Sequence, residues 1–166
     1  LKKKGNYVSI FDPKLKNFNL INKKNTDVIF NALHGKDGED GVAQSYFEYL
    51  RIPYTHSGVI SSYNSMNKII SKEIFIKEKI RTPKYFVIEK VEFSNNLLKK
   101  NLLNKKLSFP IVVKPTNEGS SLGVKVCKNY DSLVKETKKL FKKYSQLLFE
   151  QYIAGQEIQV AVINGN

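Results

Sequence analysis

One segment governs the interpretation of this chain: Phe109-Pro110-Ile111-Val112-Val113-Lys114-Pro115, which runs on into Asn117-Glu118-Gly119-Ser120-Ser121-Leu122-Gly123. A short apolar run carries Lys114 to the end of a predicted strand. A loop with two glycines and two adjacent serines follows, and apolar residues alternate again from Val124. Glycine lets a backbone approach a ligand closely, and successive amide N–H groups in such a loop can bind an anion. The segment therefore predicts two strands joined by a loop that folds over phosphates.

A second interpretation of the same residues stays open. Gly-Ser loops are ordinary hairpin connections, and Lys-Pro is a common strand ending. The segment is also not the usual P-loop, because Gly-Lys-Ser/Thr at the required spacing is absent. The local residues alone do not choose between a phosphate site and a plain hairpin.

Composition sets broad limits on the class of protein. With 166 residues, 41% of them hydrophobic and 11% aromatic, the chain has the makeup of a globular protein. It has no apolar run near the ~20 residues that span a membrane, and no apolar segment follows the opening lysines as in a secretory signal. The lack of such a run predicts that the protein has no membrane partner. Cys127 is the single cysteine, which fits a reducing compartment and predicts a cytoplasmic protein.

The net charge of +13 raises the question of nucleic-acid binding. Only Arg51 and Arg81 are arginines among the 28 basic residues, and lysine is less suited to bidentate contacts with bases and phosphates. The lysines are scattered or lie on predicted helix faces, as on a solvated surface. We therefore expect no nucleic-acid partner.

Hydrophobic patterning predicts an α/β chain. The apolar run 27–33 is typical of a strand buried on both faces of a parallel sheet, and it is followed by a glycine-rich turn and a helix from Val42. In such a unit the ligand lies at the carboxyl end of the strand. The other predicted strands are 7–11, 18–21, 85–88, 147–153 and 158–163, and the other predicted helices are 66–80, 95–106 and 130–144.

Several polar residues are candidates for a site. His34 ends the run 27–33 and could bind a substrate carboxylate, while Glu39 and Asp40 could orient it or complement the dipole of the next helix. Lys68 and Lys72 lie four apart on one helix face, where lysines are usually solvated. The candidates near the last strands are Glu150 and Glu157, which could accept hydrogen bonds from a ribose or an adenine.

The order of these segments resembles the D-alanine–D-alanine ligase family, within the ATP-grasp ligases. The matching segments are His34-Gly35-x-x-Gly38-Glu39-Asp40-Gly41 with Gln44, Ile52-Pro53-Tyr54-Thr55-x-Ser57-Gly58-Val59, Met66-x-Lys68-x-x-x-Lys72, Thr82-Pro83, Phe109 to Pro115, Glu118-Gly119-Ser120-Ser121-x-Gly123-Val124, and Glu150-x-Tyr152-Ile153-x-Gly155-x-Glu157. Together they run from His34 to Glu157 in the family's order.

The resemblance implies an activity: ATP phosphorylates one D-alanine, and the amine of a second D-alanine attacks the acylphosphate, with Mg²⁺ or Mn²⁺ on the phosphates. This reaction serves peptidoglycan synthesis. His34 would lie near the first D-alanine, with Ser120 helping to position it. The implied ATP-binding residues are Lys68, Lys114, Glu118, Gly119, Ser120, Ser121, Gly123, Glu150, Ile153 and Glu157. The family also implies a homodimer.

The resemblance implies three parts: a truncated α/β domain at 1–65, the small α+β subdomain of an ATP-grasp fold at 66–153, and the start of the large subdomain at 154–166. The family's first strand and its metal ligands would lie outside this sequence, so we expect the chain alone to be inactive. Asn67 replaces a usual aspartate, and His56 replaces a usual glycine. The alternatives are another ATP-grasp ligase, including one that joins D-alanine to a hydroxy acid, and a non-catalytic basic binding module.

Overall fold

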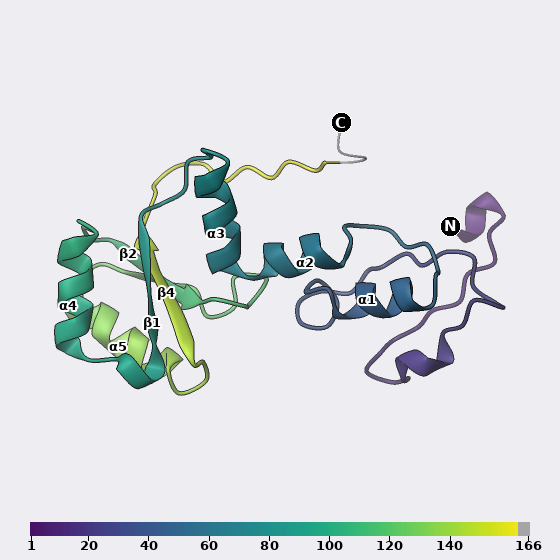
Figure 1. Cartoon of the computed structure of the whole chain (residues 1–166), viewed down its shortest axis with the longest axis horizontal. Helices are drawn as coiled ribbons and strands as arrows, with labels where there is room; N and C mark the ends of the chain where they lie inside the picture. Colours follow the sequence, from purple (N-terminus) through teal and green to yellow (C-terminus); the bar gives the residue numbers. More distant parts are fainter. Residues whose placement is uncertain (163–166) are drawn as a thin grey trace. The chain divides into compact units, whose positions relative to one another are not determined.

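The computed structural model of the chain describes residues 1–162 (Figure 1). The chain forms two compact units, Leu1–Met66 and Asn67–Asn166. Within the part of the chain that the structure describes, every strand lies in the second unit. None of the helices described there is long and apolar enough to cross a membrane.

The first unit is built mainly from short helices and loops. Its α-helices are α1 (Val42–Tyr49) and α2 (Val59–Met66), and its 3₁₀ helices are η1 (Lys2–Lys4) and η2 (Phe18–Leu20). α1 follows the glycine-rich turn, as predicted, and buries Ala43, Gln44 and Phe47. Gly41 begins it with φ +96°, and a Cβ there would lie 2.9 Å from the Val59 carbonyl oxygen, so glycine is required at this turn.

The strands predicted in the first unit are not formed. Residues 7–11 make no strand, and residues 18–21 contain η2 in place of one. The run 27–33 contributes a single parallel bridge, Ile29 to Tyr54, and it is not buried on both faces, because Val28 and Phe30 are each 61% exposed. An apolar run becomes a strand only where neighbouring strands complete its hydrogen bonds, and residues 1–66 supply just this bridge.

The second unit is organised around a four-stranded antiparallel sheet of order β1-β4-β2-β3. The strands are β1 (Tyr85–Glu89), β2 (Ile111–Pro115), β3 (Lys125–Cys127) and β4 (Gln146–Gln151). β2 and β3 are the two predicted strands on either side of the glycine-serine loop. Glu150 pairs with Val112 on one side and with Tyr85 on the other, which fixes the register of the sheet.

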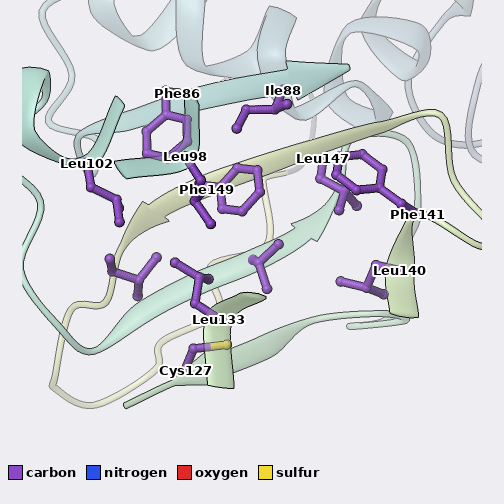
Figure 2. Packing of buried hydrophobic residues seen from close by; sticks show 12 residues of the cluster. Phe86, Ile88, Leu98, Leu102, Cys127, Leu133, Leu140, Phe141, Leu147 and Phe149 are labelled. Carbon is purple, nitrogen blue, oxygen red and sulfur yellow. The ribbon is translucent and has the colours of Figure 1, made fainter. Parts of the chain in front are cut away.

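One face of this sheet forms the core with two helices, α4 (Asn95–Asn104) and α5 (Tyr130–Leu140). Figure 2 shows the apolar side chains that meet there, with Leu98 and Leu133 supplied by the helices. Phe86 and Phe149 stack with ring centroids 4.9 Å apart. Each helix has a side-chain cap at its start, from Ser94 and Asn129 respectively, as polar residues at these positions favour.

The opposite face carries polar side chains and lies toward the helix α3 (Lys68–Lys77) (Figure 1). α3 is shorter than the predicted helix 66–80, and α5 ends before the predicted residue 144. The strand predicted over 158–163 is wrong for its described part: 158–162 form no strand and their apolar side chains are exposed, while Ile163 lies outside the described residues. Alternating apolar residues favour a strand, but none of the described residues pairs with this segment.

Candidate functional site

The alternation of side chains along the strands places Lys114 and Glu150 on the same face of the sheet. Val112 pairs with Glu150, so Lys114, two residues further along β2, lies diagonal to Glu150. The intervening Val113 and Phe149 point to the core and are fully buried. The Lys114 ammonium donates to Glu150 Oε1.

Helix α3 brings two further lysines to this face. Asn67 caps the helix, accepting hydrogen bonds from the amides of Ile69 (3.0 Å) and Ile70 (3.2 Å). The backbone N–H of Lys68 donates to the Thr116 carbonyl at 2.9 Å, which joins the start of α3 to the residue after β2. Because Lys68 and Lys72 are four residues apart, both face the sheet. We call Lys68, Lys72, Lys114 and Glu150 the lysine–glutamate cluster.

Lys72 is the most enclosed cation of the cluster, with 5% of its surface exposed. Its ammonium donates to Glu150 Oε2 at 2.9 Å, to Thr82 Oγ1 at 2.8 Å and to the Pro83 carbonyl at 3.1 Å. It also lies 4.8 Å from the centre of the Tyr85 ring. Burial lowers the pKa of Lys72, and the hydrogen bond and charge of Glu150 oppose that shift. Three acceptors thus meet the three donors of one ammonium.

Lys68 binds the backbone of the loop rather than a carboxylate. Its ammonium donates to the Glu118 carbonyl oxygen. Burial lowers the pKa of Lys68, and the positive charge of Lys114 lowers it further, against a smaller opposing effect of Glu118 and Glu150. The two lysines therefore repel each other, and an anion between them would relieve that repulsion.

The glycine-serine loop between β2 and β3 has an unusual backbone. Ser120, Ser121 and Gly123 all have positive φ, at 47°, 58° and 75°, and the first two are non-glycine residues in the left-handed region. Two backbone bonds close the turn, from Leu122 N to Gly119 O (2.9 Å) and from Val124 N to Ser121 O (3.2 Å). Such local strain recurs at ligand-binding loops.

Two contacts hold this loop against the rest of the unit. A Cβ on Gly123 would lie 2.8 Å from Pro115 Cγ and 2.9 Å from its Cδ, so the loop packs on the end of β2 without room for a side chain. At the other end of the loop, the Glu118 side chain lies near the Tyr144 hydroxyl. Burial, and then the charge and hydrogen bond of Glu118, raise the pKa of Tyr144.

In the first unit, His34 lies beside a shallow hollow whose lining includes Gln44 and His56. The imidazole is 83% exposed, with Nδ1 3.6 Å from Glu39 Oε1. Glu39 does not complement the helix; its Oε2 accepts from the Gly35 amide at 2.6 Å and so holds the turn that carries His34. Asp40 does act at the helix start, where Oδ1 accepts from the Val42 amide at 3.2 Å.

The turn that follows His34 is also held by the amide side chains of Asn31 and Gln44. Asn31 Nδ2 and Gln44 Nε2 both donate to the Gly38 carbonyl, at 3.1 and 2.8 Å. His56, where the resemblance leads us to expect glycine, adopts φ +80° and places Nδ1 2.9 Å from Thr55 Oγ1. The turn at residues 55–58, which is separate from the one after His34, therefore accommodates histidine in a backbone conformation that favours glycine.

The predicted site residues fall into three groups. In the second unit Lys68 contacts the backbone of Glu118 and Lys114 contacts the carboxylate of Glu150, and the loop residues Gly119, Ser120, Ser121 and Gly123 follow Glu118 along the chain. Ile153 and Glu157 follow β4 in an exposed segment, so their predicted contacts with adenine and ribose stay predictions. His34 belongs to the first unit, and its role with D-alanine stays a prediction too.

Sequence reasoning missed two residues of the site. Lys72 is not among the predicted site residues, because helix lysines are usually solvated, although its spacing from Lys68 places it on the same face. Tyr144, which follows the end of α5, gave no signal in the sequence, because its place near Glu118 depends on the fold of the unit.

Two family models and curated proteins of known function match the sequence of this chain. The model described as "D-ala D-ala ligase C-terminus" matches residues 74–166, and the one described as "D-ala D-ala ligase N-terminus" matches residues 6–57. A curated D-alanine–D-alanine ligase of Pelagibacter ubique is 48% identical over 162 residues, which are 98% of this chain and 52% of that protein. One of Staphylococcus epidermidis is 38% identical over 86% of this chain and 40% of its own length. The chain thus spans about half the length of the curated relatives it matches.

Solved structures of the same family resemble the fold of this chain. The crystal structure of D-alanine–D-alanine ligase from Bacillus anthracis has a TM-score of 0.71 and 42% identity, covering 80% of this chain and 42% of that one. The same enzyme complexed with ATP matches with a TM-score of 0.69 and 40% identity over the same shares. Likeness at this identity confirms the α/β fold expected from the sequence.

Proposed function

Because this chain belongs to the D-alanine–D-alanine ligase family, we propose that it supplies the phosphate-binding part of an ATP-dependent ligase that joins two D-alanines for peptidoglycan synthesis. The observation that carries this proposal is the excess of positive charge in the lysine–glutamate cluster. Lys72 and Lys114 share the carboxylate of Glu150, and Lys68, whose pKa the charge of Lys114 lowers, adds a third positive charge beside them. A polyphosphate brings the negative charge that such a place lacks.

We assign different parts of the bound ATP to different residues around the cluster. In the proposal Lys68 and Lys114 contact the phosphates of ATP, and the loop from Glu118 to Gly123 folds over them with its backbone amides. Glu150 lies further along the same face and would accept from adenosine, with Ile153 and Glu157 beside the base and ribose. What supports this division is that Lys114 lies near the end of β2 that leads into the loop, whereas Glu150 lies on the neighbouring strand β4.

The reaction would proceed through a D-alanyl phosphate, which the amine of the second D-alanine attacks. His34 would lie by the first D-alanine, on a turn that Glu39 and Gly38 hold in place, and Ser120 would help to position that substrate from the loop. The chain contributes mainly positioning and electrostatic stabilisation.

Divalent metal ions are expected on the phosphates of such a nucleotide. Among residues 1–162, no group of three or more histidine, cysteine, aspartate and glutamate side chains could hold a metal ion. The described residues therefore do not fit a metal site, and no step of the reaction is assigned to one here.

Two further expectations accompany the proposal. We expect the complete protein to form a homodimer, as the resemblance to the family implies. A cytoplasmic location is supported by Cys127, which is buried and free, as is usual in reducing compartments.

The closest alternative is a ligase that joins D-alanine to a hydroxy acid, which shares the phosphate site and differs in its acceptor. A non-catalytic basic module is the alternative from another class, and the surface lysines are the feature in its favour. The ATP affinity of the chain separates both ligases from that module. The product made from D-alanine, with or without D-lactate, separates the two ligases and is measured on a chain extended to the full length of the relatives, because these 166 residues alone are expected to be inactive.

Calorimetric titration of the chain with ATP tests the proposal, with Lys114→Met as the variant and Lys138→Met, an exposed lysine of α5, as the matched control. We expect Lys114→Met to weaken ATP binding about tenfold or more, because a charged hydrogen bond to phosphate is lost, and the control to bind as wild type does. Equal affinities of the two variants would remove Lys114 from the site. Absence of ATP binding together with salt-sensitive binding of duplex DNA would favour the basic module.

A further inference from the structure

Lys72 and Lys114 hold the two oxygens of the same carboxylate, but their surroundings differ. The ammonium of Lys72 has three acceptors, Glu150, Thr82 and Pro83, and its side chain is 7% exposed. With all three donors engaged, it has none left for a ligand. Lys72 is therefore built into the protein and does not form part of a ligand-binding surface.

Lys114 is the more accessible of the two. Its side chain is 18% exposed, it lies at the end of β2 next to the loop, and its ammonium contacts Glu150 Oε1. A phosphate that binds under the loop competes with Glu150 for this ammonium. When Lys114 turns to the phosphate, Glu150 keeps one cation, because Lys72 stays on Oε2.

We propose that Lys72 is a positioning residue of the ATP site: it is the fixed counter-ion of Glu150, and it thereby lets Lys114 exchange Glu150 for a phosphate of the bound nucleotide. Without Lys72, the exchange would leave a buried carboxylate with no cation, which is strongly unfavourable. Glu150 is 7% exposed, so water could not replace the lost partner fully. The inference rests on the proposed function and adds a role for a residue that does not touch the ligand.

The test compares ATP with adenosine, which has no phosphate and requires no exchange of Lys114. In Lys72→Met, we expect ATP to bind about tenfold more weakly or worse, while adenosine loses several-fold less affinity than ATP does, because Lys114 can then stay on Glu150. Removing the charge of Glu150 should cancel the defect. The double variant Lys72→Met, Glu150→Gln should bind ATP within about threefold of Glu150→Gln alone.

These results separate the role of Lys72 from loss of structure and from failure of the proposed function. A damaged fold would weaken ATP and adenosine alike and would not be rescued by Glu150→Gln; that outcome, or unchanged ATP affinity in Lys72→Met, overturns the inference alone. Absence of ATP binding by the wild-type chain overturns the proposed function and this inference with it. Circular dichroism of each variant checks that it is folded.

A measurement on the wild-type chain keeps the inference testable even where Lys72→Met fails to fold. Lysine acetylation followed by mass spectrometry reports which ammonium groups are accessible. ATP should reduce acetylation of Lys114, while Lys72 stays unmodified with and without ATP. Acetylation of Lys72 that rises when ATP is added would show that Lys72 moves, which contradicts a fixed counter-ion.

Discussion

Gly123 closes the glycine-serine loop onto the end of β2, and replacing it with alanine tests whether that contact fixes the loop. Its φ is +75°, and a Cβ would lie 2.8 and 2.9 Å from two atoms of the Pro115 ring and 3.5 Å from Leu140 Cδ2. The proline ring is rigid and Pro115 is buried, so it cannot move aside as a flexible side chain would. The loop itself must shift to accommodate the methyl group.

Two costs contribute to the expected loss of stability. A left-handed alanine costs about 1–2 kcal/mol, and forcing a methyl group into a packed site costs about 1–3 kcal/mol. Gly123→Ala should therefore lower the free energy of unfolding of the second unit by about 2–5 kcal/mol. Gly155→Ala is the matched control, because Gly155 also has positive φ, +156°, yet nothing lies within 4 Å of its Cβ position. It should lose only the conformational part.

Urea denaturation followed by circular dichroism measures both variants, since the chain has no tryptophan to report by fluorescence. The transition of the second unit is the one to compare, because two units can unfold separately. ATP affinity should fall in Gly123→Ala, as the displaced loop no longer covers the phosphates. If Gly123→Ala loses no more stability than Gly155→Ala, the contact with Pro115 does not hold the loop and the reasoning is refuted.

Two further predictions concern the two units separately. Phe149→Ala should destabilise the second unit by about 3–5 kcal/mol, because its ring is fully buried and stacks on Phe86; urea denaturation measures this, and a loss no greater than that of the half-exposed Val126→Ala would contradict it. In the first unit, burial, and then the hydrogen bond and charge of Glu48, raise the pKa of Tyr54 from 10.0 to about 12. Since the folded pKa lies above the unfolded one, this contribution to stability is complete below pH 10 and is lost between pH 10 and 12; Tyr54→Phe should lack that part of the pH dependence, and identical alkaline unfolding profiles would rule it out.

The sequence predicted the second unit well because its signals are local. Apolar runs of strand length, bounded by proline or glycine, marked β1, β2 and β4, and helical patterning marked α4 and α5. Each of these elements finds partners within residues 67–162. For these elements the patterns and the packing agree, whereas the strand predicted from residue 158 has no pairing partner among the described residues.

In the first unit the local signals and the packing disagree. Residues 27–33 have strand composition but only Tyr54 as a bridge partner, and pairing partners are not encoded in the run itself. α2 is not predicted, because the residues 59–66 include three serines, which are poor helix formers, and follow Gly58, which has no side chain that could cap a helix. Lys72 was undervalued for a related reason: lysine is usually exposed, and only contacts with distant residues such as Glu150 bury this one.

The replacement of a usual aspartate by Asn67 shows how the start of α3 and the charge of the site are connected. Asparagine and aspartate are about equally good N-caps, and Asn67 accepts from two helix amides, so the helix start is preserved. The neutral amide adds no negative charge next to Lys68, whose pKa burial and Lys114 already lower. The cluster therefore has less internal compensation than it would have with aspartate, and more of its positive charge is left for an anionic ligand to neutralise.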